Sequence, residues 1–331
     1  MFSLHRKPAL IEVLLPTFNS ARYLAEAVES ILHQSCRDLE LVILDGGSTD
    51  ATTGIVRAYA ALDRRVRLAT FPGMHPARRV DAWLRRSRAE FVALQHSDDV
   101  SYPHRLERQV LAFGGNPALG VCSASYRSFW HEREGPAARE GATVHPKPAT
   151  HAEIKAQLLF WWVMHAPTLM LRREKIAACG LRFANEFQFA NDYWQTVAHI
   201  DRLPYCNLPE ELSAYRLHAR SDGPLHLEQL RQEERVLKER ILRHFGFAFT
   251  PRELELHLAL KLIPDGRLQV ATRAEHDEAA RWLENLRAQN ERRKVFDGPT
   301  FSALLDRLGG QIAALGSRLA EGTPERTAHE R

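Results

Sequence analysis

The chain has 331 residues, of which 44% are apolar and 26% charged, and its formal net charge is +4. A chain of this length can bury a core large enough to fold without a metal or a disulfide framework. The longest apolar run, residues 158–164, is far shorter than the about twenty residues of a membrane-spanning helix. The N-terminus lacks the apolar core of a signal peptide, so we expect a cytoplasmic protein.

The basic residues are 38 arginines and 7 lysines. A guanidinium fork suits phosphate binding, but GC-rich codons produce the same excess, and we attribute most of it to coding bias. A net charge of +4 over this length does not indicate nucleic acid, so we expect no such partner. Cys36, Cys122, Cys179 and Cys206 form no C-x-x-C pair, which predicts reduced, mostly buried thiols.

Predicted strands and helices alternate along the first 130 residues. Apolar runs predict strands at residues 9–15, 39–44, 65–71, 90–95 and 120–129, the first of them ended by Pro16. Helical periodicity predicts helices at residues 20–32, 51–62, 74–88 and 103–113, the first capped by Ser20. This alternation predicts an α/β fold with a mostly parallel, doubly wound sheet.

The chain becomes helical from about residue 226. Capping patterns at Thr250 and Thr272 begin two predicted helices, and a last one covers residues 301–319. We therefore predict a first domain at residues 1–225, with a first half at about 1–128 and a second at about 150–225. A helical C-terminal extension follows at residues 226–331.

Three polar segments, 16–19, 45–50 and 96–99, directly follow predicted strands. Carboxyl ends of parallel strands meet at one edge of a sheet, where ligands of such folds bind. Asp98 and Asp99 would repel each other unless a cation lay between them, and a divalent ion with a diphosphate is the natural occupant. Turn formation and helix capping remain alternative roles for these carboxylates.

Several ordered motifs resemble family 2 glycosyltransferases of the GT-A fold. They are segments 13–35, 41–50, 91–107, 166–173, 187–194 and 215–218, and segment 282–290 resembles tails of bacterial members that build surface glycans. The resemblance covers about residues 9–300. It implies a Rossmann-like, doubly wound mixed sheet followed by the helical extension.

The resemblance also implies an activity. The protein would be an inverting, metal-dependent hexosyltransferase that moves a sugar from a UDP-sugar to a hydroxyl of a bacterial lipopolysaccharide, capsule or exopolysaccharide. Asp192 would be the general base, and Asp98 and His218 would bind Mn²⁺ or Mg²⁺. The implied donor-binding residues are Pro16, Thr17, Phe18, Asn19, Asp45, Arg78, His96 and Asp98.

The sequence departs from the family pattern at several positions. His96 stands where the metal loop often begins with Asp, and Asn191 stands where Glu usually precedes the base. Asp81 replaces an Asn, and the sequence leaves open whether Arg78 or Arg79 reaches the donor. These departures motivate an alternative, a catalytically silent nucleotide-sugar-binding homologue that acts as a binding or partner subunit.

Other roles remain open at this point. Asp192 could instead cap a helix, and Trp161 and Trp162 could stack on an acceptor sugar or pack in the core. A nucleotidyltransferase is disfavoured because no Gly-rich loop with a following Lys lies near the first strand. The expected partners are a nucleotide-sugar donor and a saccharide or lipid-linked glycan acceptor, with peripheral association at the cytoplasmic face of the inner membrane. The donor sugar and a homodimeric state stay undecided.

Overall fold

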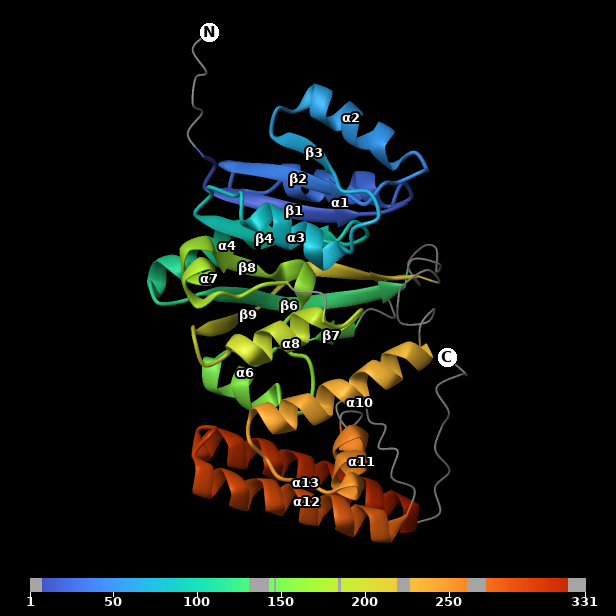
Figure 1. Ribbon diagram of the computed structural model, residues 1–331, viewed down its shortest axis with the longest axis vertical. Helices are drawn as coiled ribbons and strands as arrows, with labels where there is room; N and C mark the ends of the chain where they lie inside the picture. The colour runs from blue at the N-terminus through green and yellow to red at the C-terminus, as the bar shows by residue number, and fades with distance from the viewer. Residues whose placement is uncertain are drawn as a thin grey trace. The chain divides into compact units, whose positions relative to one another are not determined.

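The computed structural model describes residues 8–130, 143–145, 147–183, 186–218, 227–260 and 272–320 (Figure 1). The chain divides into two compact units. The first contains Met1–His151 and Val163–Leu230, and the second contains Ala152–Trp162 and Arg231–Arg331. A short segment from the middle of the chain therefore belongs to the second unit. The predicted limits of independent domains, at residues 225 and 226, stay a prediction.

One mixed sheet organises the first unit. Its strands are β1 (Ile11–Thr17), β2 (Leu39–Asp45), β3 (Val66–Thr70), β4 (Phe91–Leu94), β5 (Val100–Ser101), β6 (Val121–Trp130), β7 (Thr143–His145), β8 (Met170–Arg172) and β9 (Tyr205–Leu217). Their order is β3-β2-β1-β4-β8-β6-β9-β5, with β7 beside β6. Strands β3, β2, β1 and β4 are parallel, β8 runs against both β4 and β6, and β9 is parallel to β6.

Helices cover both faces of this sheet. They are α1 (Leu24–Leu32), α2 (Thr52–Leu62), α3 (Pro76–Leu84), α4 (Arg105–Gly115), α7 (Arg173–Cys179) and α8 (Asn191–His199), with a 3₁₀ turn, η1 (Ala166–Thr168). Ile11, Val13 and Leu15 share a buried cluster with apolar residues of α1, α2 and α4. Alternate residues of a strand point to opposite faces, and α3 packs on β1 and β2, on the viewer's side in Figure 1.

The first strand and helix differ from the prediction in two details. Strand β1 continues through Pro16 to Thr17. The Leu14 carbonyl accepts from the Gln95 N–H, so the even-numbered residues of β1, Pro16 included, direct their backbone groups toward β4. The pairing of β1 with β4 has already ended at Leu94. The missing N–H of Pro16 therefore breaks no ladder bond. Helix α1 begins at Leu24 without a side-chain cap, and the Ser20 hydroxyl donates to the Phe18 carbonyl instead.

Strand β9 was not predicted as a strand. Its 13 residues include Pro209 and two glutamates, a composition without a strand pattern. It pairs with β6 along its length, and the register shift between Ala124 and Ser125 leaves Pro209 and Glu210 outside the pairing. On the side away from β6, β9 pairs only with the two-residue β5. Strand β9 therefore lies near the edge of the sheet, where polar side chains are tolerated.

The cysteines are only partly as expected. All four are free thiols, and Cys122 is buried, but Cys36, Cys179 and Cys206 are half-buried. The prediction of mostly buried thiols is therefore wrong for three of them. Cys206 lies on β9, beside Cys122 on β6, where the sheet nears its edge.

The second unit consists of α6 (His151–Gln157, from Ala152 onward), α10 (Leu227–His244, from Arg231 onward), α11 (Pro251–Leu260), α12 (Arg273–Arg293) and α13 (Gly298–Ala320). Thr272 and Glu275 form the predicted capping box of α12, and Thr250 accepts from the Glu253 N–H at the start of α11. None of the described helices combines the length and the apolar character that crossing a membrane requires.

Buried polar groups of the helices hold the turn that follows α6. Lys238 of α10 donates to the Phe160 carbonyl. His257 of α11 donates through Nε2 to the Leu159 carbonyl at 2.9 Å, and its Nδ1 accepts from the Trp282 indole at 3.3 Å. Because both ring nitrogens of His257 are engaged in this way, the ring is neutral.

We expect His257 to make the protein sensitive to acid. Burial, and next the charge of Lys238, lower its pKa to about 3, below the unfolded value of about 6.5. The stability due to the neutral ring is therefore present above pH 6.5 and is lost as the pH falls toward 3. Between pH 6 and 4 the free energy of unfolding should fall more steeply, by about 1.4 kcal/mol per pH unit, than in His257→Gln. Chemical unfolding at several pH values measures both slopes, and equal slopes would contradict the prediction.

Candidate functional site

The turn after β2 is organised by Asp45. Its buried carboxylate accepts from the backbone N–H groups of Gly47 at 2.9 Å and Ser48 at 3.1 Å, and from the Ser48 hydroxyl at 2.5 Å. Gly47 has a φ of 93°, a conformation that residues with a Cβ rarely adopt. The turn-forming role left open by the sequence is therefore present, and the strand end is rigid where a ligand would bind.

The loop after β1 is bound to this turn. Asn19, with a φ of 48°, donates from its backbone to the Ser48 hydroxyl at 2.9 Å and accepts at Oδ1 from the Thr49 N–H at 2.9 Å. The Phe18 ring is 58% exposed, and Pro16 is half-buried. The Thr17 hydroxyl is buried, with no hydrogen-bond partner among the described residues. The loop therefore presents an unused polar atom beside an open aromatic ring.

The two arginines of α3 have different environments. Arg79 is buried, and its Nη1 donates to the carbonyls of Thr17 at 2.6 Å and Leu44 at 2.5 Å. Burial lowers the pKa of Arg79, and the nearby Asp45 opposes this effect. Arg78 is exposed. Arg79 therefore joins the ends of β1 and β2, and its Nη1 is committed to protein carbonyls.

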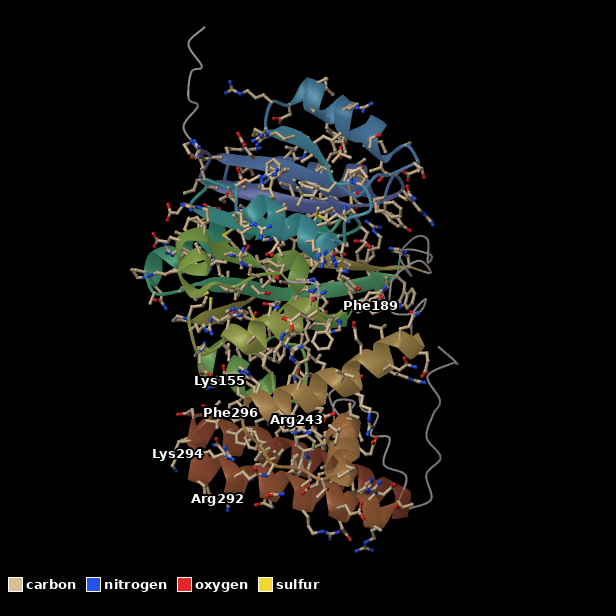
Figure 2. The ribbon with its side chains drawn as sticks, in the orientation of Figure 1. Lys155, Phe189, Arg243, Arg292, Lys294 and Phe296 are labelled. Atoms are coloured by element: carbon tan, nitrogen blue, oxygen red, sulfur yellow. The ribbon has the colours of Figure 1, made fainter. Side chains whose placement is uncertain are left out.

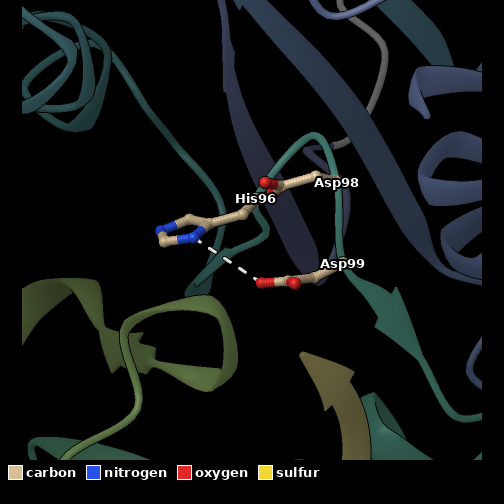
Figure 3. A group of neighbouring side chains, drawn as sticks. All are labelled: His96, Asp98 and Asp99. Atoms are coloured by element: carbon tan, nitrogen blue, oxygen red, sulfur yellow. Dashed lines mark ion pairs between the residues drawn. The ribbon is translucent and has the colours of Figure 1, made fainter. Parts of the chain in front are cut away.

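The loop after β4 brings together His96, Asp98 and Asp99, whose potential ligand atoms all lie within 4.8 Å of one another (Figure 3). His96 Nδ1 is 3.6 Å from Asp99 Oδ2. Asp99 is fully buried, and Oδ2 has no hydrogen-bond partner among the described residues. Burial, and next the charge of Asp98, raise the pKa of Asp99 well above its usual range.

This donor set fits a divalent cation. Imidazole nitrogen and carboxylate oxygen are common ligands of Mn²⁺, and a bound dication would offset the repulsion between the adjacent carboxylates. The unpartnered Oδ2 of Asp99 is an oxygen that a cation would satisfy. The sequence predicted a cation beside Asp98 and Asp99 but did not include Asp99 among the metal ligands, because adjacency alone does not show which of two carboxylates turns inward.

Strand β9 completes the cluster from a distant part of the sequence. His218, just past its end, lies with Nε2 3.1 Å from Asp98 Oδ2, and its ring stacks obliquely on Tyr23 at 5.0 Å. Arg216 donates from its backbone to Asp99 at 2.9 Å and from Nε to the Asp98 carbonyl at 2.8 Å. The predicted pair of Asp98 and His218 is therefore adjacent in space.

Asp192 is the second residue of α8. The N-cap is Ala190, so Asp192 does not fill the alternative capping role. Its Oδ1 accepts from the Tyr193 N–H at 2.9 Å, and burial raises the pKa of Asp192 to about 6. Asp192 as a whole residue is half-buried, so part of it is accessible to solvent. A carboxyl group with this pKa is largely ionised at neutral pH and can accept a proton.

Two residues have supporting roles that the sequence did not predict. The Asn191 Oδ1 accepts from the N–H groups of Glu186 at 2.9 Å and Phe187 at 3.0 Å, so it organises the segment before Asp192. Arg105 is fully buried and donates to the Gln95 side chain at 2.9 Å and the Leu94 carbonyl at 2.6 Å. Both act on neighbours that are visible only once the chain is folded.

The two tryptophans considered for acceptor stacking belong to the second unit, whereas the side chains described above belong to the first. Trp161 and Trp162 belong to the segment in the second unit and are half-buried. Trp161 Nε1 donates to Gln157 Oε1 at 3.2 Å. Phe160, immediately before them, is the fully buried ring of this turn. Figure 2 shows the side chains on the ribbon.

Comparison with known proteins identifies the class. The mixed sheet with polar loops at its strand ends is that of a glycosyltransferase of the GT-A fold. Residues 12–180, about half of the chain, match the family model described as glycosyl transferase family 2. The chain belongs to this family.

Relatives and solved structures agree with this assignment. An uncharacterized glycosyltransferase of Haemophilus influenzae is 24% identical over 243 residues, which are 71% of this chain and 74% of that protein. Chondroitin synthase of Escherichia coli is 30% identical over 133 residues, 40% of this chain but only 19% of that protein.

Two solved structures share the fold. Residues 1–349 of Staphylococcus aureus TarS, in complex with UDP-GlcNAc, give a TM-score of 0.55 at 16% identity and cover 96% of this chain and 93% of that one. The mannosyltransferase PcManGT of Pyrobaculum calidifontis, in complex with GDP-Man and Mn²⁺, also gives 0.55 at 16% identity and covers 94% and 88%. At these identities the likeness concerns the fold alone.

The buried position of Arg79 predicts a large stability difference between two neighbouring substitutions. Arg79→Met would remove a buried, charged donor from the carbonyls of Thr17 and Leu44, although the Thr17 carbonyl would still accept from the Gly46 N–H at 2.9 Å. We expect this loss to lower the free energy of unfolding by about 2–4 kcal/mol. Arg78→Met, on the exposed side of the same helix, should change it by less than about 0.5 kcal/mol. Chemical unfolding of both variants measures the difference, and equal losses would show that Arg79 does not support the loops.

Proposed function

We propose that this enzyme is an inverting, metal-dependent transferase that moves a sugar from a UDP-sugar to a hydroxyl of a bacterial surface glycan. The observation that carries the proposal is the cluster of His96, Asp98 and Asp99, with His218 beside it, at the carboxyl edge of the sheet. Support for the donor comes from TarS, solved with UDP-GlcNAc, and support for a metal comes from PcManGT, solved with Mn²⁺. Chondroitin synthase supports a polysaccharide as product.

The donor nucleotide would bind at the ends of β1 and β2. The exposed Phe18 ring offers a face for the base, and the buried, unpartnered Thr17 hydroxyl offers a hydrogen bond. Asp45 and Asn19 hold the loop that shapes this site. Arg78 is the exposed guanidinium available for the diphosphate, since Arg79 is committed to carbonyls.

Mn²⁺ or Mg²⁺ would be held by Asp98 and His218, with His96 and Asp99 next to them. When bound, such an ion supplies Lewis-acid stabilisation of the charge that develops on the leaving diphosphate. The protein's own part is to keep the ligands close together. Arg216 does this by donating from its backbone N–H to the Asp99 carboxylate and from Nε to the Asp98 carbonyl.

Asp192 would accept the proton of the acceptor hydroxyl. As the hydroxyl oxygen attacks the anomeric carbon, the bond to the diphosphate breaks on the opposite face, and one such displacement inverts the anomeric centre. Its pKa of about 6, raised by burial, suits a base at neutral pH. Asn191 cannot share a proton with it, so Asp192 would act as a single carboxylate.

Location and assembly belong to the same proposal. The net charge of +4 supports a weak, salt-sensitive association with anionic lipid at the cytoplasmic face of the inner membrane. Co-sedimentation with anionic liposomes at low salt would support it, and no binding at low salt would reject it. A homodimer is tested by the mass measured in solution by light scattering.

Two substitutions test the assigned roles. We expect Asp192→Asn to lower sugar transfer, measured as UDP release with an acceptor panel, by at least about 100-fold while UDP binding persists. Asp98→Ala should weaken Mn²⁺-dependent UDP binding in calorimetry as well as turnover. Glu174→Gln, on the exposed face of α7, is the matched control and should behave as wild type.

The outcomes separate the alternatives. Full activity of both variants would reject the roles of Asp192 and Asp98. UDP binding that needs Mn²⁺, but without turnover on any acceptor, would favour the silent homologue. A parallel screen with GDP-mannose tests the nucleotide, because PcManGT was solved with GDP-Man.

The pH dependence of transfer gives an independent test of the base. Asp192 accepts a proton only when ionised, so kcat/KM should fall about tenfold per pH unit below its pKa of about 6 and level off above it. Initial rates from pH 4.5 to 8 at low acceptor concentration measure this profile. An acid limb centred near pH 4 would show that Asp192 is not the titrating base.

A further inference from the structure

A stack of rings in the first unit has no role in the proposed transfer. Tyr126 of β6 is stacked on His165 with ring centroids 3.7 Å apart, and on His145 of β7 at 4.5 Å. Tyr215 of β9 meets His165 edge-on at 5.5 Å. Four separate segments of the first unit therefore converge on one short row of rings.

Lys147 adds a cation to this row. Its Nζ lies 5.0 Å from the centroid of the Tyr126 ring. Burial lowers the pKa of Lys147 to about 8, so the contact with the ring offsets only part of the lost hydration. Among the described residues, no carboxylate pairs with this ammonium. Glu211, on the adjacent β9, is already bound at both oxygens by Arg127, at 2.8 and 3.0 Å.

His165 offers a second unused group. The residue is only 7% exposed, and its Nε2 is buried without a hydrogen-bond partner among the described residues. Burial lowers the pKa of His165 well below its usual range, and the charges of Lys147, His96, Arg105 and His145 lower it further, in that order. The contacts agree with this effect, because Lys147 and His145 both contact the Tyr126 ring on which His165 stacks.

Such an arrangement is costly for a purely structural core. A buried donor without a partner costs free energy, and so does a desolvated ammonium. A ring stack that served packing alone would need neither group. Both costs disappear if an anion accepts hydrogen bonds from Lys147 Nζ and from a protonated Nε2 of His165.

We propose that Lys147 and His165 form a subsite for an anionic group of the acceptor, a carboxylate or a phosphate. The chain around His165 lies against the strand that leads to the metal cluster, because the turn η1, which directly follows His165, contacts β4. The Leu94 N–H, two residues before His96, donates to the Leu169 carbonyl at 2.8 Å. The inference rests on the proposed function, because the anion is taken to belong to the acceptor of the sugar transfer. The acceptor class it names is an acidic glycan, built with uronic acid or phosphate-bearing units.

Binding of matched sugars to the full chain tests this subsite. The probes are methyl β-D-glucoside, which is neutral, methyl β-D-glucuronide, which carries a carboxylate, and methyl β-D-glucoside 6-phosphate. Titration calorimetry at pH 7, with UDP and Mn²⁺ present, measures each affinity. We expect either anionic probe to bind at least about tenfold more tightly than the neutral one, as one charge-assisted hydrogen bond provides.

Variants assign the effect to the subsite. In Lys147→Met the anionic and the neutral probes should bind with about equal affinity. Lys147→Arg keeps the charge and should retain the preference for the anionic probes. Lys175→Met on α7 is the control for a lysine elsewhere and should leave it unchanged. The melting temperature of each variant and its affinity for UDP with Mn²⁺ show that the fold and donor site persist.

The results decide between clear alternatives. Equal binding of neutral and anionic probes, or a preference that survives Lys147→Met, overturns the subsite. A stronger response to the glucuronide or to the phosphate names the acceptor's anion, and both support the proposal. Loss of UDP binding in the wild type would instead count against the proposed function, and probe titrations without UDP would then still test the subsite.

Discussion

Arg216 binds the Asp98–Asp99 loop through its backbone N–H and its Nε, and its guanidinium also pairs with Glu26 on α1. Two adjacent carboxylates, one of them fully buried, repel each other and lose hydration, so the loop needs fixed donors and nearby positive charge. Because Arg216 lies on β9, this contact brings His218 to Asp98 and aligns the later half of the sheet with the ends of the first strands. The arrangement of the loops at the strand ends, and of the proposed metal ligands, follows from it.

The same requirement explains the arginines beneath the loops. Arg79 donates to the carbonyls where β1 and β2 end, and Arg105 donates to the carbonyl where β4 ends. Buried carbonyls at strand ends need hydrogen-bond donors, and the Thr17 carbonyl has one backbone donor, the Gly46 N–H, besides Arg79. These arginines supply such donors and contribute positive charge to an acidic edge. A small part of the arginine excess is therefore structural, although neither side chain needs to touch a substrate.

Much of the parallel half was predictable because its signals are local. Apolar runs marked β1, β2, β3 and β4, and the polar segments around Asp45 and Asp98 marked their ends. Strand β9 escaped prediction because its pairing with β6, not its composition, makes it a strand. Local pattern could not choose between Arg78 and Arg79, since their burial depends on carbonyls of distant loops. The Lys147–His165 cluster was missed for the same reason, because its members meet only in the folded sheet.

The membership of residues 152–162 in the helical unit has a consequence for synthesis on the ribosome. Leu159 and Phe160 leave the ribosome long before Lys238 and His257, whose side chains bind their carbonyls. At about 5–20 residues per second, the interval between Phe160 and Lys238 is about 4–16 s. During that time the turn after α6 lacks its final partners, and its apolar side chains must be shielded by the nascent chain or a chaperone. The helices near the C-terminus thus complete a piece of structure begun in the middle of the chain, and a premature stop codon would leave it exposed.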